Sequence, residues 1–133
     1  MALLVDASVF CAYANKDDVH HEKAANIIRE ILANKHGEAI TTDYIFDETI
    51  TVILRRTNKK TAIEAGNFIL DSEVSIFEIN KLIFQKAWEI FKTNGSFSFT
   101  DCATIAFAQT FGIDSIATFD KEFKKLKSVK IID

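Results

Sequence analysis

The stretch FSFTDCATIAFAQTFGIDSIATFD, residues 97–120, predicts a helix followed directly by a strand. Ser98 and Asp101 have the spacing of a capping box, so we expect the helix to run over residues 99–111. Its segment CATIAFA is apolar nearly all round, which predicts that the helix is buried. The run SIAT, residues 115–118, is typical of a buried strand. A helix that leads into a strand is a building unit of α/β sheets.

The rest of the chain repeats this alternation of short apolar runs and helical segments. Further strands are predicted at residues 2–5, 38–41, 74–79 and 129–132, the last as an edge strand. Further helices are predicted at residues 20–35, 43–56, 60–71 and 80–93. Strands that alternate with helices form parallel sheets covered on both faces. The predicted fold is therefore a three-layer α/β/α sandwich with a central, mostly parallel sheet.

Length and composition fit a single domain over residues 1–133. Apolar residues make up 48% of the chain and charged residues 26%, which is the balance of a globular domain. The start MALLVDASVF is interrupted by Asp6 and lacks leading positive charges, and no apolar run approaches membrane-spanning length. We therefore expect a soluble, cytoplasmic protein.

Net charge and cysteine spacing exclude some simple sources of function. The formal net charge of -3 gives no overall attraction to nucleic acid or acidic membranes, so phosphate binding needs local lysines or a metal. Cys11 and Cys102 lie among apolar neighbours without C-x-x-C spacing. This pattern predicts reduced core residues and argues against a zinc or dithiol site.

Three aspartates are predicted to lie at one edge of the sheet. Asp6 and Asp120 each follow a predicted strand, and Asp101 lies in the first turn of the buried helix. Ligands of parallel sheets bind beyond the carboxyl ends of the strands. Each aspartate alone has an ordinary structural explanation as a cap or turn residue. Together they predict a site for Mg²⁺ or Mn²⁺, because a divalent cation offsets the repulsion between clustered carboxylates.

A fourth acidic group is available in TTDYIFDETITVILRR, residues 41–56. A helical wheel places one polar arc along this helix, made of Asp47, Glu48, Thr51 and Arg55. Periodicity therefore does not choose between Asp47 and Glu48. A solvated stripe in which Glu48 pairs with Arg55 is an equally good interpretation.

Two further charged segments have structural interpretations that we favour. KDDVHHEK groups five potential metal ligands: Asp17, Asp18, His20, His21 and Glu22. Adjacent histidines at a helix start point in different directions, which favours an exposed, capped helix entrance over a metal site. The lysine-rich tail KEFKKLKSVK, residues 121–130, is typical of a solvated helix face, although its place beside Asp120 leaves phosphate binding open.

Four motifs, LLVDAS, TTDYIFDETITVILRR, FSFTDCATIAFA and IATFDKEF, resemble in their order those of the PIN-domain family. The chain most resembles small single-domain VapC-type toxins, and the similarity covers almost its whole length. The resemblance implies catalytic, metal-binding positions at Asp6, Glu48, Asp101 and Asp120. It thereby selects Glu48 over Asp47. Ser8 corresponds to the family's small hydroxyl residue near the metal, and Thr118 to the hydroxyl residue common just before the last acidic position. Ser98 is a further supporting residue, as the predicted cap of the helix that carries Asp101.

The resemblance implies a Mg²⁺- or Mn²⁺-dependent endoribonuclease, the toxin of a type II toxin-antitoxin pair. It further implies a homodimer and a small antitoxin protein that blocks the site. No protein nucleophile is needed, because metal ions activate water for attack on phosphorus. The number of ions stays open. RNA-phosphate contacts in the tail would come from Lys121, Lys124 and Lys125.

Two alternative functions share parts of this pattern. A non-catalytic PIN-like adaptor would keep the fold and bind partners without cutting RNA. A Mg²⁺-dependent phosphotransfer or phosphoacceptor domain would also place aspartates at strand ends. This last class fits less well, because VDAS lacks the paired acid of a D-x-D phosphatase and no lysine directly follows SIAT. RNA cleavage with and without Mn²⁺ separates the three functions.

Overall fold

One five-stranded parallel sheet organises the computed structural model, which describes residues 1–93 and 95–133. Its strands are β1 (Ala2–Val5), β2 (Glu38–Thr42), β3 (Ser75–Phe77), β4 (Ser115–Ala117) and β5 (Lys130–Ile132). They lie in the order β3-β2-β1-β4-β5, and each neighbouring pair is parallel. The last strand is an edge strand, as the sequence predicts.

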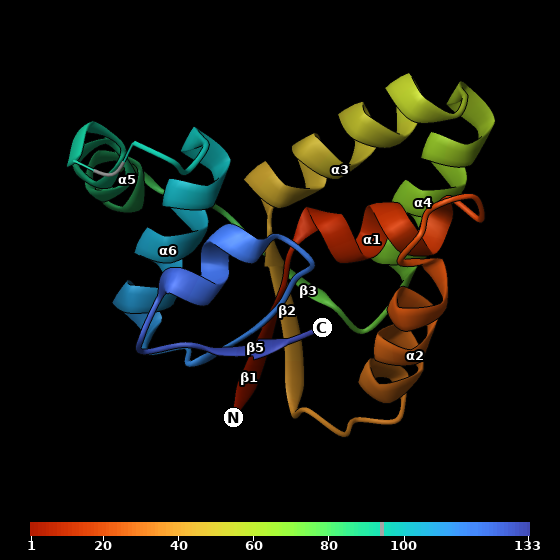
Figure 1. Cartoon of the computed structure of the whole chain (residues 1–133), viewed down its shortest axis with the longest axis horizontal. Coiled ribbons are helices and arrows are strands. Elements are labelled where there is room, and N and C mark those ends of the chain that lie inside the picture. The colour runs from red at the N-terminus through yellow and green to blue at the C-terminus, as the bar shows by residue number, and fades with distance from the viewer. Residues whose placement is uncertain (94) are drawn as a thin grey trace.

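Helices cover both faces of this sheet. They are α1 (Ala7–Ala14), α2 (His21–Leu32), α3 (Asp43–Arg56), α4 (Lys59–Asp71), α5 (Lys81–Thr93), α6 (Phe99–Phe111) and the 3-10 helix η1 (Lys121–Lys125). Helices α1 to α4 lie on one side of the sheet, and α5, α6 and η1 lie on the other (Figure 1). The predicted three-layer α/β/α sandwich is thus confirmed. Among the described helices, none is long and apolar enough to cross a membrane.

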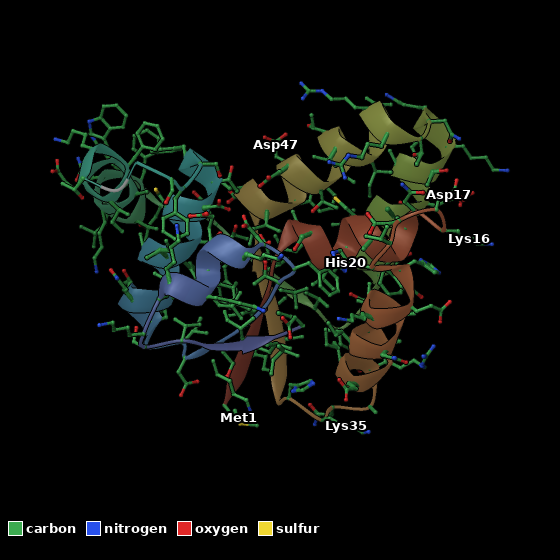
Figure 2. All side chains as sticks on the ribbon, viewed as in Figure 1. Met1, Lys16, Asp17, His20, Lys35 and Asp47 are labelled. Atoms are coloured by element: carbon green, nitrogen blue, oxygen red, sulfur yellow. The ribbon has the colours of Figure 1, made fainter. Side chains whose placement is uncertain are left out.

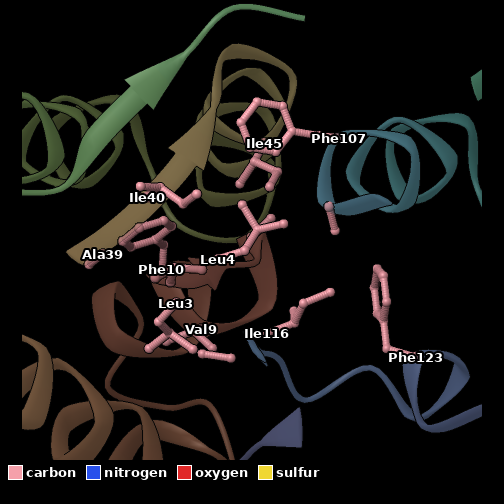
Figure 3. Packing of buried hydrophobic residues seen from close by; sticks show 14 of the residues in the cluster. Leu3, Leu4, Val9, Phe10, Ala39, Ile40, Ile45, Phe107, Ile116 and Phe123 are labelled. Carbon is pink, nitrogen blue, oxygen red and sulfur yellow. The ribbon is translucent and has the colours of Figure 1, made fainter. Parts of the chain in front are cut away.

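The core is centred on β1, the middle strand of the sheet. Leu3, Leu4 and Val5 have no exposed surface, because a central parallel strand is covered on both faces. Phe107 of α6 and Phe123 of η1 close the core on one side of the sheet (Figure 3). The apolar runs of the strands therefore hold the carboxyl end of β1 in a fixed place.

Helix α6 forms as its sequence predicts. The Ser98 hydroxyl accepts a hydrogen bond from the Asp101 N–H (3.1 Å), and the Asp101 carboxylate accepts one from the Ser98 N–H (3.4 Å). Gly112 ends the helix with a left-handed φ of 65°. This capping box fixes Asp101 in the first turn of a helix whose inner face is buried.

The sequence prediction misses helix α1. Its segment ASVFCAYA is separated from β1 by the single residue Asp6 and is buried on most sides. A short, nearly all-apolar helix has no polar stripe, so the amphipathic pattern that identified the other helices is missing.

Two boundaries differ from the prediction by more than one residue, each for a local reason. Helix α2 ends at Leu32, before the predicted residue 35, because Asn34 adopts a left-handed φ of 58°. Strand β3 ends at Phe77, before the predicted residue 79. There the N–H of Ile79 donates to the Asp43 carboxylate (3.0 Å) instead of to a strand neighbour.

The strand order creates a switch point at β1. From β1 the chain proceeds to β2 on one side, and it later returns to β4 on the other side. The connections leave β1 and β4 in opposite directions, which opens a crevice beyond their carboxyl ends. Asp6 and Asp120 follow these two strands, so the fold brings them to this crevice.

Candidate active site

An acidic cleft of about 440 Å³ lies beyond the carboxyl ends of β1 and β4. It is lined by all four predicted metal-binding residues, which come from four places in the fold. Asp6 follows β1, and Glu48 comes from the first half of α3. Asp101 comes from the start of α6, and Asp120 is the N-cap of η1. The cleft also contains a fifth carboxylate, Asp18.

Asp6 is held by two hydroxyl groups. Ser8 Oγ (2.9 Å) and Thr118 Oγ1 (2.7 Å) both donate to Asp6 Oδ2. Asp6 is only 4% exposed, and burial raises the pKa of its carboxyl group, although the hydrogen bonds from Thr118 and Ser8 lower it. The two hydroxyls therefore orient a carboxylate that the protein interior disfavours.

The same hydroxyls join the end of β1 to the loop after β4. Thr118 Oγ1 accepts a hydrogen bond from the Asp120 N–H (3.0 Å), and Ser8 Oγ accepts one from the Phe119 N–H (3.0 Å). Asp120 Oδ1 in turn accepts from the Glu122 N–H (3.0 Å) at the start of η1. Ser8 and Thr118, predicted as supporting residues, thus connect Asp6 to the backbone of Asp120.

Asp101 is 9% exposed and points into the cleft from the start of α6. Burial, with the negative charges of Asp6 and Asp120, raises the pKa of Asp101 to about 6. The hydrogen bonds with Ser98 lower that pKa but do not offset the burial. The predicted supporting residue Ser98 therefore positions this carboxylate and also lines the cleft.

Glu48, and not Asp47, is the acidic residue of α3 that lines the cleft. Asp47 is exposed and points away from the sheet (Figure 2). Glu48 Oε2 is buried, without a hydrogen-bond partner among the described residues. Burial, with the negative charges of Asp6 and Asp101, raises the pKa of Glu48 to about 7. No ion pair between described residues joins Glu48 to Arg55, so that interpretation is wrong.

The lining of the cleft fits a hard divalent cation. Its acidic donors are all carboxylate oxygens, which Mg²⁺ and Mn²⁺ prefer. The unpartnered Glu48 Oε2 supplies an acceptor that a cation would satisfy. Within the described part of the chain, no three side chains are already placed as ligands of a single ion. Binding would therefore draw the carboxylates together or use bridging water.

The α1–α2 connection supplies cleft residues that the sequence did not identify as such. The His20 ring stacks on Phe119 with centroids 4.6 Å apart, and the His20 N–H donates to Asp18 Oδ1 (2.8 Å). All three residues line the cleft, whereas His21 Nδ1 is bonded to the Ala12 carbonyl (2.9 Å). Asp17 is exposed on the outer part of this connection, beside Lys16 (Figure 2). The missed helix α1 explains why this loop was not placed beside the cleft.

Both cysteines are free and buried, as the sequence predicts. Cys11 lines the cleft, where burial and the nearby charge of Glu48 raise its pKa to about 12. A thiol with so high a pKa stays protonated at neutral pH, and only the thiolate is a strong nucleophile. Cys11 is therefore not equipped for nucleophilic catalysis.

The three lysines predicted as phosphate contacts lie outside the cleft lining. They are exposed on η1, which is a short 3-10 helix instead of a solvated α-helix. Lys124 forms an ion pair with Asp133 (3.0 Å), and Lys125 forms one with Glu122 (2.9 Å). Any RNA contact by Lys121, Lys124 and Lys125 would therefore be made beside the cleft and stays a prediction.

A model of the PIN-domain family matches residues 3–129. The chain is 25% identical over 131 residues to the 23S rRNA-specific endonuclease VapC20 of Mycobacterium tuberculosis, covering 97% of both chains. It is 27% identical over 126 residues to a VapC ribonuclease of Archaeoglobus fulgidus, covering 92% of this chain and 80% of that protein.

Solved structures share the fold. The crystal structure of M. tuberculosis VapC20, described as a sarcin-ricin loop cleaving toxin, matches with a TM-score of 0.86 at 25% identity over 96% of both chains. The structure of VapBC2 from Rickettsia felis, bound to a DNA fragment from its promoter, matches with a TM-score of 0.69 at 13% identity. That match covers 98% of this chain and 97% of the other, and at this identity it shows the fold alone.

Proposed function

This chain belongs to the PIN-domain family, and from this premise we propose that it is a Mg²⁺- or Mn²⁺-dependent endoribonuclease. The observation that carries the proposal is the convergence of Asp6, Glu48, Asp101 and Asp120 in one cleft at the switch point of the sheet. Such a cluster is costly without a cation, as the raised pKa values of Asp101 and Glu48 indicate.

In the proposed site, Asp6 and Asp101 are the principal metal ligands, and Glu48 and Asp120 complete the set directly or through water. When bound, a divalent cation lowers the pKa of water and neutralises charge on phosphate oxygens. The hydroxyls of Ser8 and Thr118 hold Asp6 in orientation through bonds of 2.9 and 2.7 Å. The capping box with Ser98 does the same for Asp101.

Water is the proposed nucleophile. It forms a bond to phosphorus as one P–O ester bond breaks, and the leaving oxygen takes up a proton. Burial and the neighbouring carboxylates raise the pKa of Glu48 to about 7 in the metal-free cleft, and a bound cation would favour the ionised form that serves as a ligand. The Ser8 hydroxyl donates to Asp6, a proposed metal ligand, and accepts from the Phe119 N–H, so its role in this proposal is to orient Asp6. The Cys11 thiol, with a pKa of about 12, stays protonated at neutral pH.

RNA is the proposed substrate class, and ribosomal RNA is the first target to test. The support is similarity over nearly the whole chain to a protein named as a 23S rRNA-specific endonuclease and to one named as a ribonuclease. We further propose that the chain is the toxin of a type II toxin-antitoxin pair, active in the cytoplasm as a homodimer and blocked by a small antitoxin.

The test is incubation of the purified chain with intact bacterial ribosomes and, separately, with protein-free ribosomal RNA. Each reaction contains Mg²⁺, Mn²⁺ or EDTA, and the new RNA ends are mapped by primer extension. We expect discrete internal cuts that require a divalent cation. RNA that stays intact under all these conditions while the folded protein still binds it would favour the adaptor function. Equal cutting in EDTA would exclude the metal-dependent mechanism.

A further inference from the structure

Arg56 is the one lysine or arginine that lines the acidic cleft in the described part of the chain. The cleft also contains five carboxylates, from Asp6, Asp18, Glu48, Asp101 and Asp120. An RNA phosphate that enters is repelled by these groups wherever a metal ion does not neutralise them. A fixed cation at the cleft wall would therefore contribute directly to substrate binding.

The helix geometry explains how Arg56 reaches the cleft. Glu48, Val52 and Arg56 are spaced four residues apart on α3, and all three line the cleft. Residues with this spacing share one helix face. Arg56 lies ~12 Å further along the helix axis than Glu48, at 1.5 Å per residue. It is thus placed for a phosphate that flanks the reacting one.

The guanidinium of Arg56 is not committed to another partner. None of the ion pairs between described residues involves it. By contrast, Lys124 and Lys125 both have acidic partners. The positive charge of Arg56 lowers the pKa of the Cys11 thiol, against the larger effect of burial. Because Cys11 also lines the cleft, this effect indicates that the charge of Arg56 acts inside it.

Arg56 also has a purely structural explanation. Basic residues are favoured in the last turn of a helix, where they interact with the helix dipole. Arg55 and Arg56 both occupy the last turn of α3, and both are exposed. Arg55, however, does not line the cleft. The adjacent Arg55 therefore provides a control with the same charge in the same helix turn but outside the cleft.

We propose that Arg56 is a substrate-binding residue that contacts an RNA phosphate next to the scissile one. The guanidinium suits this role, because it offers two parallel N–H donors to phosphate oxygens. The inference rests on the proposed ribonuclease function and adds a specific contact to it. It also assigns phosphate binding within the cleft to α3, whereas the lysine-rich tail lies outside.

The test measures binding without cleavage. A labelled, unstructured single-stranded RNA is titrated with Asp101→Asn protein over a salt series, in Mg²⁺ so that the remaining carboxylates are neutralised. The same titration is made with Arg56→Ala, Arg55→Ala or Arg56→Lys introduced into this protein. Arg56→Ala should weaken binding about tenfold. It should also make the negative slope of log K against log salt less steep by ~0.7, the value expected for one phosphate neutralised on a single strand. Arg56→Lys should keep the slope and bind with part of the original affinity, whereas Arg55→Ala should change neither.

Wild-type cleavage of ribosomal RNA is measured in parallel, so that two failures can be told apart. If the wild type cuts RNA but Arg56→Ala and Arg55→Ala bind it equally well, the role of Arg56 is overturned and the ribonuclease function stands. If RNA binding depends on Arg56 but the wild type cuts no RNA, the ribonuclease function is overturned. Circular dichroism of each variant verifies that it is folded.

Discussion

Replacing Asp101 by asparagine should stabilise the metal-free protein above neutral pH. Asp101 is 9% exposed, and burial with the charges of Asp6 and Asp120 raises its pKa from 3.8 to about 6. A carboxyl group with a higher pKa in the folded state destabilises that state when it ionises. The asparagine amide removes the charge and keeps an oxygen that accepts from the Ser98 N–H.

The rise in the Asp101 pKa sets the size of the effect. A change from 3.8 to about 6 corresponds to at most ~3 kcal/mol of unfolding free energy at high pH. The cleft is open to water, so we expect ~1–2 kcal/mol after solvent screening. For a chain of this size, that gain raises the melting temperature by roughly 3–10 °C.

The pH dependence follows from the sign of the change. The contribution that the neutral Asp101 carboxyl group makes to stability is fully present below its unfolded pKa of 3.8, and it is lost as the pH rises through the folded pKa of about 6. The advantage of Asp101→Asn should therefore be largest at about pH 8 and roughly a third as large at about pH 4.5, which lies between the unfolded and folded pKa values. Thermal unfolding in EDTA at both pH values measures it, with Asp47→Asn as control because Asp47 is exposed. Equal shifts for Asp101→Asn and Asp47→Asn, or a larger gain at the lower pH, would refute this reasoning.

Three other predictions concern the groups around the cleft. Thr118→Val removes the hydroxyl that donates to Asp6 (2.7 Å) and accepts from the Asp120 N–H (3.0 Å). It should lower the free energy of unfolding in denaturant by ~1.5–3 kcal/mol. A loss no larger than that caused by Thr110→Val, at an exposed threonine, would show that these two hydrogen bonds contribute little to stability. Glu48→Gln should reduce the rise in melting temperature that Mn²⁺ causes, since only a ligand that binds the folded state stabilises it; an undiminished rise would place the ion elsewhere. Replacing Lys121, Lys124 and Lys125 together by alanine should make the negative slope of log K against log salt for RNA binding less steep, by ~0.7 for each phosphate that these lysines bind. An unchanged slope would mean that the three lysines form a solvated surface without RNA contacts.

The sequence predicted the fold well because its helices and strands have distinct patterns. Helix α6 could be predicted from Ser98 and Asp101, whose capping box forms as expected. Helix α1 could not, because ASVFCAYA is buried on most sides and gives no amphipathic signal. Without α1, the following loop with Asp18 and His20 had no predicted place beside the cleft.

The acidic cluster was predictable from strand ends, but the cationic side of the cleft was not. Asp6 and Asp120 follow neighbouring parallel strands, and the topology alone brings them together. The choice of Glu48 over Asp47 depended on resemblance, and the burial of Glu48 Oε2 now supports it physically. Arg56 gave no distinguishing signal, because it follows Arg55 at a helix end where basic residues are common.

The most direct test of the proposed function is the single-turnover rate of ribosomal RNA cleavage by Asp101→Asn in Mn²⁺. Asp101 is a proposed metal ligand from α6, and its replacement by an amide of similar shape should leave the fold intact. We expect the cleavage rate to fall by orders of magnitude, while the control Asp47→Asn retains the wild-type rate. Cleavage by Asp101→Asn at the wild-type rate would contradict the assignment of this cleft as the ribonuclease active site.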